Sequence, residues 1–184
     1  MATVKTSVDA WFDAGLEALA GGGPDAVRIE TLARSLGVTK GGFYWHFPDR
    51  PAFLDRMLDR WEQRAVENVI ARLESHDASP RDRLRELFGL ATTFVGEGGI
   101  AIELAVRDWA RRDPAVAARL AGVDERRMGY LRALFRQLTV DPLEAEARCL
   151  VAYSLYIGTH FVAAGHPGHT RDAVMTRALE DLLT

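Results

Sequence analysis

The 184-residue chain is poor in the features that stabilise secreted, thiolate-metal and membrane proteins. Cys149 is its only cysteine, which excludes an internal disulfide and a thiolate metal cluster built within one chain. No apolar run approaches the roughly 20 residues that a membrane helix needs, and the polar start of the sequence lacks the apolar stretch of a secretory signal. These absences predict a cytoplasmic protein.

Positive charge is also scarce for the chain as a whole. The net charge is −3 and the isoelectric point is about 6.0, which argues against nucleic acid as a partner, since phosphate binding depends on clustered lysine and arginine. Between residues 28 and 50, however, cations modestly outnumber acids. The cations of that segment are Arg28, Arg34, Lys40 and Arg50, and its acids are Glu30 and Asp49.

The alternating β-branched pattern of strands is missing, and apolar residues recur at spacings of three and four almost throughout. The sequence therefore predicts an all-α fold. A cap residue followed by proline marks helix starts at Ser79, Asp113 and Asp141, with a looser version at Asp49. We expect about nine helices, near residues 5–20, 29–36, 40–46, 50–75, 80–95, 100–111, 114–138, 142–164 and 170–183.

The fourth predicted helix carries one apolar stripe, formed by Leu54, Met57, Leu58, Trp61, Ala65, Val69 and Leu73. The stripe extends about 30 Å at 1.5 Å per residue, so the helix must pack along another element for most of its length. We expect a small N-terminal domain over residues 1–50 and a larger helical domain over residues 51–184.

Residues 29–46 have the composition of a helix-turn-helix. Such a motif needs a small residue where the two helices cross, a turn residue that tolerates a positive φ, and apolar residues that lock the helices together. Ala33 supplies the small residue and Gly37 supplies the turn. The locking residues are Leu32, Leu36, Val38 and Phe43.

The second helix of this motif, residues 40–46, is unusual for a structural helix. Two glycines near its start cost roughly 1 kcal/mol each relative to alanine, and close approach of the backbone to a partner surface is the simplest reason to omit a side chain. Thr39 either caps this helix or turns its hydroxyl toward a phosphate. Phe43 and Phe47 are expected to face inward, whereas Lys40, Tyr44, Trp45 and His46 face outward.

This motif resembles the DNA-binding domain of the TetR family of bacterial transcriptional regulators. Residues 28–47, followed by Arg50 and Phe53-Leu54, carry the resemblance, which covers about residues 7 to 60. It implies an N-terminal three-helix DNA-binding domain and a C-terminal bundle that binds ligand and dimerises. The implied function is that of a repressor. A homodimer would bind a palindromic operator with half-sites about 34 Å apart, and a small-molecule effector would release it.

The resemblance assigns DNA contacts residue by residue. Thr39 and Tyr44 would bind phosphates. Contacts of this kind fix the register of a protein on the duplex. Lys40 and Gly41 would meet base edges or the adjoining backbone. These four positions surround the start of the recognition helix.

Four further positions would flank these contacts. Trp45 and His46 would lie beside the groove, and Arg50, at the start of the next helix, would hold a phosphate. Arg28 stands where the family commonly has a threonine cap. Arg28 could still contact a phosphate, but its side chain cannot cap the helix, because it cannot accept a hydrogen bond from a backbone N–H.

The implied bundle would hold an effector cavity, and bulky or polar residues on apolar helix faces are the candidates to line it. Arg107, beside Asp108, would either meet an anionic effector or pair with a neighbour. The fourth helix would carry the signal to the DNA-binding domain, and a coupling of about 1–3 kcal/mol would suffice. The candidate ligand-binding residues are Trp61, Phe88, Phe94, Glu103, Arg107, Trp109, Tyr130 and Tyr153.

The last two predicted helices each carry an apolar stripe suited to a four-helix contact between subunits. The same stripes would serve equally to close the core of the monomer. The first comprises Leu150, Tyr153, Ile157, Phe161 and Ala164, and the second comprises Val174, Leu179 and Leu182 or Leu183.

An enzyme and a helical adaptor with a degenerate helix-turn-helix are the competing classes. A metal site would use His160, His166 and His169, with Glu180 or Asp181 as oxygen ligands. Gly165 and Pro167 interrupt any helix face that these histidines would share. No catalytic triad, phosphate-cradling glycine loop or carboxylate pair lies on a suitable element. We therefore expect no enzymatic activity, no metal and no cofactor, and as partners operator DNA, a second copy of the chain and an unidentified small molecule.

Overall fold

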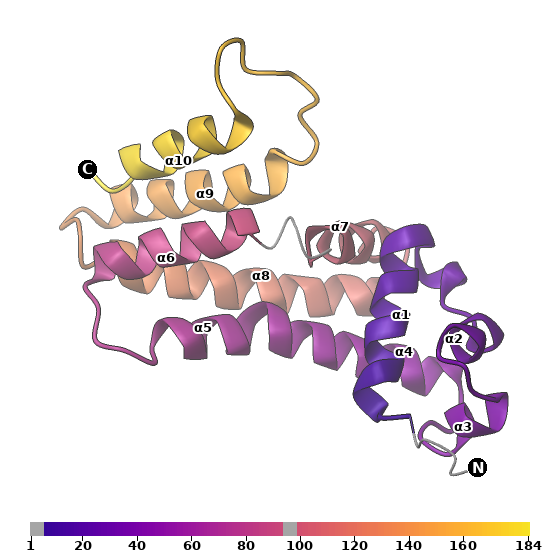
Figure 1. Ribbon diagram of the computed structural model, residues 1–184. Coiled ribbons are helices and arrows are strands. Elements are labelled where there is room, and N and C mark those ends of the chain that lie inside the picture. Colours follow the sequence, from indigo (N-terminus) through magenta and orange to yellow (C-terminus); the bar gives the residue numbers. More distant parts are fainter. Residues whose placement is uncertain (1–5, 94–98) are drawn as a thin grey trace. The chain divides into compact units, whose positions relative to one another are not determined.

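The computed structural model describes residues 6–93 and 99–184, and every regular element in those ranges is helical (Figure 1). This confirms the predicted all-α fold. The described residues form two compact units, one of residues 6–67 and 99–122 and the other of residues 68–93 and 123–184. No helix within these ranges is both long and apolar enough to cross a membrane.

The first unit is built around α1 (Val8–Gly22), which packs against α2 (Ile29–Ser35), α4 (Arg50–Glu62) and α7 (Gly99–Ala110). The short α3 (Lys40–Tyr44) packs on α2. Gly15 allows α1 and α4 to approach closely, because a Cβ at this position would lie 2.7 Å from the Phe53 ring. The fully buried side chains of this unit include Trp11, Leu16, Phe43, Phe47, Phe53 and Met57.

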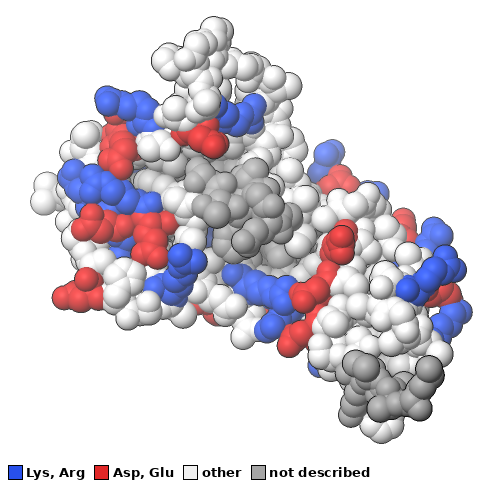
Figure 2. Space-filling view, in the orientation of Figure 1, with Lys and Arg blue, Asp and Glu red and all other residues white. Residues whose placement is uncertain are grey.

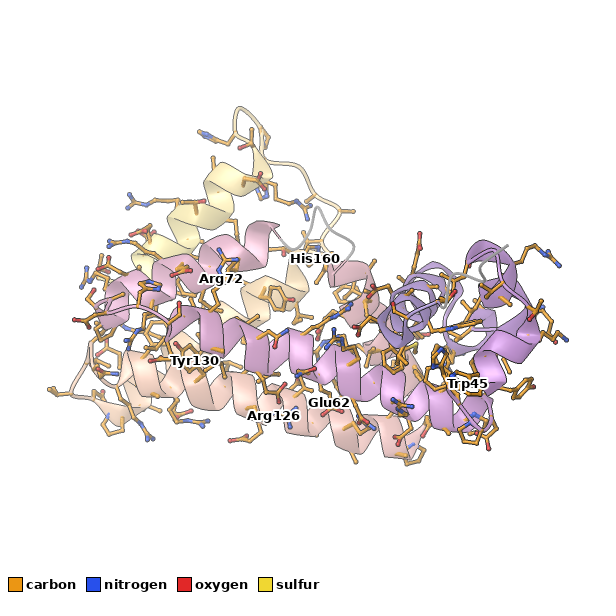
Figure 3. The ribbon with its side chains drawn as sticks, turned by 60° about the horizontal axis from the view of Figure 1, so that its bottom comes forward. Trp45, Glu62, Arg72, Arg126, Tyr130 and His160 are labelled. Carbon is orange, nitrogen blue, oxygen red and sulfur yellow. The ribbon has the colours of Figure 1, made fainter. Side chains whose placement is uncertain are left out.

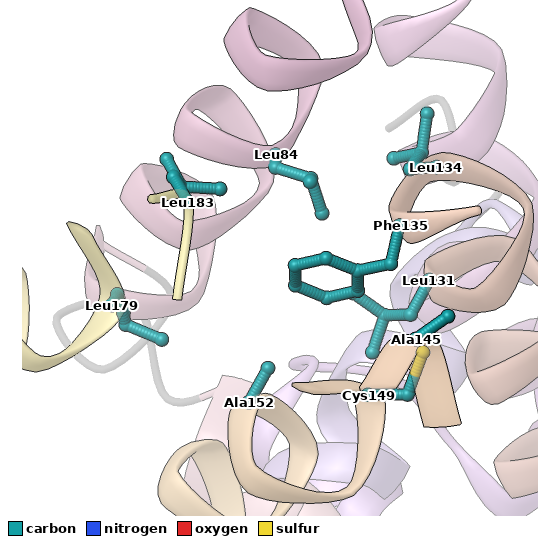
Figure 4. Packing of buried hydrophobic residues seen from close by; sticks show 9 residues of the cluster. All are labelled: Leu84, Leu131, Leu134, Phe135, Ala145, Cys149, Ala152, Leu179 and Leu183. Carbon is teal, nitrogen blue, oxygen red and sulfur yellow. The ribbon is translucent and has the colours of Figure 1, made fainter. Parts of the chain in front are cut away.

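The second unit contains α5 (Asn68–Leu73), α6 (Pro80–Thr93), α9 (Pro142–Gly158), α10 (Arg171–Asp181) and the last part of α8 (Pro114–Phe135). Side chains from α6, α8, α9 and the C-terminal segment meet in one apolar core (Figure 4). Its buried members are Leu84, Leu131, Leu134, Phe135, Ala145, Cys149, Ala152, Leu179 and Leu183.

The two apolar stripes predicted for a subunit contact differ in exposure. Leu179 and Leu183 are buried in the core of the second unit and Leu182 packs against it, so the stripe of α10 helps to close the monomer. On α9, Tyr153 also packs against this core, whereas Leu150 is 62% exposed. The exposed face of α9 consists of Leu143, Ala147, Leu150, Val151 and Ser154.

The helix starts predicted from cap residues followed by proline are confirmed. Asp49 accepts a hydrogen bond from the Ala52 amide at 2.8 Å, and Asp141 accepts one from the Leu143 amide at 2.9 Å. The side chains of Ser79 and Asp113 likewise accept hydrogen bonds from first-turn amides of α6 and α8. Each cap satisfies an N–H that has no partner within its own helix.

The helix predicted over residues 50–75 contains an irregular turn. A π-helical turn, Gln63–Glu67, joins α4 to α5. Its wider spacing makes Val66 the buried residue that follows Trp61 and leaves the predicted Ala65 half-buried. Valine buries more apolar area than alanine, which offsets the poorer geometry of the turn.

The predicted end of the α9 helix near residue 164 is wrong, because α9 ends at Gly158. Arg171, the first residue of α10, donates from Nη1 to the Thr159 carbonyl and from Nη2 to the Val162 carbonyl, the latter at 2.7 Å. These carbonyls belong to the segment that leaves the helix. A side chain of the next helix therefore satisfies two carbonyls that follow α9.

Candidate nucleic-acid interface

The turn between α2 and α3 has the geometry that a helix-turn-helix requires. Gly37 adopts a φ of +68°, a left-handed conformation that side chains disfavour. The Val38 amide donates to the Ala33 carbonyl at 2.9 Å, which closes the turn. Leu32 and Ala33 are buried, so the two helices meet on an apolar contact. The predicted helix-turn-helix is confirmed.

Buried aromatic rings fix the orientation of α3. The ring of Phe43 is fully buried and lies 5.4 Å from the ring of Trp11 and 5.3 Å from that of Phe53, both nearly perpendicular to it. Because Phe43 faces inward, the opposite side of α3 is presented to solvent. Tyr44 is 55% exposed and the neighbouring Trp45, labelled in Figure 3, is 73% exposed.

The two glycines of α3 are not required by the packing of the protein itself. A Cβ at Gly41 would lie 3.5 Å from the Thr39 hydroxyl, and one at Gly42 would lie 3.9 Å from Trp11 and Val38. Both distances are ordinary van der Waals contacts, and neither glycine has a positive φ. The absence of side chains therefore leaves a smooth helix surface without relieving any internal clash.

Thr39 occupies the N-cap position of α3, but its side chain makes no capping hydrogen bond. Of the two roles expected from the sequence, the structure thus excludes the cap and leaves the hydroxyl for another acceptor. Lys40, the first residue of α3, pairs through Nζ with Oε1 of Glu30 on α2. The hydrogen bond from Lys40 lowers the pKa of the Glu30 carboxyl.

Two arginines predicted to meet phosphate contact the loop before α2. Arg50 donates from Nε to the Val27 carbonyl at 2.8 Å and from Nη2 to the Pro24 carbonyl. Arg28 is the N-cap of α2 without a side-chain cap bond, and its Nε donates to the Asp25 carbonyl at 3.1 Å. Both guanidinium groups therefore help to shape the edge of the motif.

The end of the recognition segment is fixed by two contacts, neither of which was predicted from the sequence. Nε2 of His46 lies 3.1 Å from the Thr6 carbonyl. Arg56 of α4 donates from Nη1 to the His46 carbonyl at 3.3 Å, and its guanidinium lies 5.1 Å from the Phe47 ring centroid. Arg56 and His46 are ten positions apart across a turn, so no periodic pattern in the sequence links them.

Ion pairs also link α4, and the π-helical turn that follows it, to α1. Arg60 pairs with Asp9 at 2.9 Å and Arg64 pairs with Asp13 at 2.6 Å. On the face of the molecule drawn in Figure 2, cationic and anionic side chains lie next to one another in several patches. The cations on α4 thus serve largely to position the helix that follows the motif.

Residues 12–57 match the sequence profile of the bacterial regulatory proteins of the tetR family. This segment is a TetR-family domain. It begins within α1, contains the whole helix-turn-helix and ends within α4. No curated protein matches the chain by sequence.

Several solved structures share the fold of the chain that carries this TetR-family domain. A putative transcriptional regulator from Saccharomonospora viridis in complex with choline is 21% identical, with 96% of this chain and 94% of that chain covered and a TM-score of 0.77. A TetR-family regulator from Agrobacterium tumefaciens is 16% identical, with 96% and 95% covered and a TM-score of 0.75. AibR, in complex with isovaleryl coenzyme A and operator DNA, is 15% identical, with 96% and 97% covered and a TM-score of 0.72.

The candidate effector residues lie outside the helix-turn-helix and are divided between the two compact units. Trp61, Glu103, Arg107 and Trp109 belong to the same unit as the TetR-family domain. Glu103 is 1% exposed, and its carboxylate accepts a hydrogen bond from Arg107 Nε at 2.8 Å. Arg107 therefore has the neighbouring partner that was one of its two expected roles.

The other candidates belong to the second unit, except Phe94, which lies outside the described residues. Phe88, Tyr130 and Tyr153 all pack against the core of that unit. The hydroxyl of Tyr130, which is labelled in Figure 3, donates a hydrogen bond to Glu74 at 2.7 Å. The pKa of Tyr130 is raised, mainly by burial and also by this hydrogen bond.

Tyr153 links α9 to α8 through its hydroxyl. It donates to Asp124 at 2.7 Å and accepts a hydrogen bond from Arg127 at 3.1 Å. The histidines considered for a metal site do not converge. In the two described ranges, no group of three or more His, Cys, Asp or Glu side chains is arranged to hold a metal ion.

Proposed function

We propose that the chain is a ligand-responsive transcriptional repressor that binds a palindromic operator as a homodimer and is released by a small-molecule effector. Residues 1–50 would read DNA, and residues 51–184 would bind the effector and dimerise. The repressor would act in the cytoplasm, where bacterial DNA lies, and would catalyse no reaction.

The observation that carries this proposal is the surface of α3. Tyr44 and Trp45 are exposed by more than half, beside two glycines that the interior does not require. Large exposed aromatic side chains on a rigid helix indicate a binding surface. A smooth helix at the end of a helix-turn-helix fits the major groove, where its first residues reach base edges.

Within this interface, α3 and its N-cap residue supply the direct contacts. Thr39 and Tyr44 would donate hydroxyl hydrogen bonds to phosphates, and Lys40 and Gly41 would approach base edges. Trp45 would lie beside the groove. His46, Arg28 and Arg50 would act mainly by positioning the backbone, because each already bonds a main-chain carbonyl.

The exposed face of α9 is the proposed dimer contact. Leu143 is 76% exposed and Leu150 is 62% exposed, and the face between them carries no charged side chain. Such a face is self-complementary under two-fold symmetry, because the same apolar residues would pack on their copies. A dimer would also present two recognition helices to successive turns of the duplex.

An effector is proposed on the strength of the structural relatives. One relative is in complex with choline and another with isovaleryl coenzyme A and operator DNA. These ligands differ in chemistry, so neither is assigned to this chain. The candidate lining residues are Trp61, Phe88, Phe94, Glu103, Arg107, Trp109, Tyr130 and Tyr153.

The proposal is tested by selection from a pool of duplexes with a random core of about three helical turns. The wild-type protein should enrich one palindromic sequence, and footprinting should place that sequence in DNA flanking its own gene. A matched protein carrying Tyr44→Ala and Trp45→Ala should enrich none. If the wild-type chain enriches no sequence while remaining folded, the proposed function is wrong.

A further inference from the structure

The ion pair between Glu30 and Lys40 joins the two helices of the motif at the proposed DNA surface. Glu30 lies in the first turn of α2 and Lys40 is the first residue of α3. The side chains of Glu30 and Lys40 are 57% and 55% exposed, respectively. The sequence contains no other acidic residue between positions 26 and 48, and no other lysine or arginine between positions 35 and 49.

Stability does not explain this pair. An ion pair between two exposed side chains contributes little to folding. The contact between α2 and α3 is already made by buried residues, among them Leu32, Ala33 and Phe43. An acid on a surface that faces a polyanion also opposes binding, since it repels phosphate. Neither stability nor attraction to DNA therefore explains the carboxylate of Glu30 at this position.

The donors of the lysine supply a reason. An ammonium group has three N–H donors, and Glu30 takes one of them, which leaves two for other acceptors. The pair as a whole is neutral. A neutral pair gains little from a phosphate, because the attraction of Lys40 is offset by the repulsion of Glu30, but it can still donate to uncharged acceptors such as the O6 and N7 atoms of guanine.

We propose that Glu30 is a specificity-determining residue that positions Lys40 for a base edge, guanine above all, and disfavours its use as a phosphate contact. This inference rests on the proposed DNA-binding function. The lowered pKa of the Glu30 carboxyl agrees with it, because the carboxylate then stays ionised at neutral pH and below. Glu30 acts through Lys40 and is a positioning residue.

The experiment compares two fluorescent duplexes, the sequence selected by the wild-type protein and a shuffled duplex of the same composition. Glu30→Gln should tighten binding to the shuffled duplex by about fivefold per subunit at 0.15 M salt, the gain expected from one added phosphate contact. Binding to the selected duplex should change less. The ratio of the affinity for the selected duplex to the affinity for the shuffled duplex should therefore fall. The slope of log affinity against log salt on the shuffled duplex should steepen by about 0.9 per subunit.

Two controls separate this role from a general effect of charge. Glu17→Gln removes the same charge from an exposed position on α1 and should leave the affinity ratio unchanged. In a Lys40→Met background, Glu30→Gln should lose its effect on the ratio, because the pair no longer exists. Thermal unfolding of each variant confirms that the fold is retained.

The outcomes are distinct. A fall in the ratio that depends on Lys40 supports the inference. Equal tightening on both duplexes, equal weakening, no change, or an effect that persists without Lys40 overturns it. Each of those results still leaves a protein that selects a duplex, whereas a wild-type protein that selects none defeats the proposed function itself.

Discussion

Arg119 on α8 donates a hydrogen bond from Nε to Oε1 of Glu62 on α4 at 2.6 Å. Its Nη1 and Nη2 pair with Asp55 and Asp59 on the same helix, the first at 2.5 Å. One guanidinium group thus pairs with three carboxylates along one side of α4 and offsets part of their negative charge. Without it, their like charges would repel one another at spacings of three and four residues.

Arg119→Ala should therefore destabilise the protein by roughly 1–2 kcal/mol, a value that allows for the exposure of Asp55 and Asp59. Lysine has no planar fork, so Arg119→Lys should recover only part of this loss. Chemical denaturation measures the free energy of unfolding of both variants. Arg112→Ala, which breaks an exposed pair with Asp108, is the matched control and should change stability by less than about 0.5 kcal/mol.

Lys40→Ala should weaken binding to the selected duplex and leave thermal stability nearly unchanged. The side chain is exposed, so its removal creates no cavity. Loss of one good base contact costs about 1–3 kcal/mol, or roughly five- to 150-fold in affinity. Fluorescence anisotropy measures this loss, with Arg112→Ala as a control. Unaltered affinity would show that Lys40 does not contribute to DNA binding.

Trp45 offers a direct optical test of the interface. The other three tryptophans, Trp11, Trp61 and Trp109, are buried, so acrylamide should quench mainly the emission of Trp45. Adding the selected duplex should protect this emission from acrylamide, whereas Trp45→Phe should abolish the quenchable fraction. Quenching that DNA does not alter would show that Trp45 lies away from the duplex.

Leu150→Asp should dissociate the proposed dimer without unfolding the subunit. Leu150 lies on the exposed face of α9, so a carboxylate there costs little in a monomer but is expensive in an apolar contact. Sedimentation velocity distinguishes the two states. Ala71→Asp adds the same charge at an exposed position on α5 and should leave the sedimentation coefficient as in the wild type.

The single thiol reports on the core of the second unit. Cys149 is fully buried, and this burial raises its pKa to about 11. At pH 8 the reactive thiolate should be roughly 200-fold scarcer than in an unfolded chain, whose thiol pKa is about 8.5. A thiol reagent should therefore react slowly until denaturant is added. Rapid reaction with the folded protein would contradict the packing shown in Figure 4.

The parts of this fold that depend on neighbouring residues could be predicted from the sequence. Asp49 and Asp141 cap helices that begin within two residues of them, and Gly37 has the positive φ that its turn demands. Phe43 and Phe47 face inward as their spacing on the helix predicts.

The features that were not predicted depend on contacts between residues that are not neighbours in the sequence. The hydrogen bonds from Arg50 to the Pro24 and Val27 carbonyls cannot be seen in a local pattern, nor can those from Arg171 to the carbonyls that follow α9. The pair of Glu30 and Lys40 spans two helices, so neither position alone predicts it. The DNA and effector contacts themselves stay predictions.

The π-helical turn at Gln63–Glu67 has a consequence for how the long helix can vary. Because such a turn accommodates one residue more than a regular α turn, it behaves as a one-residue insertion absorbed without a loop. Deleting a residue there would restore regular α-helical winding. The turn therefore lets this helix gain or lose one residue without a loop.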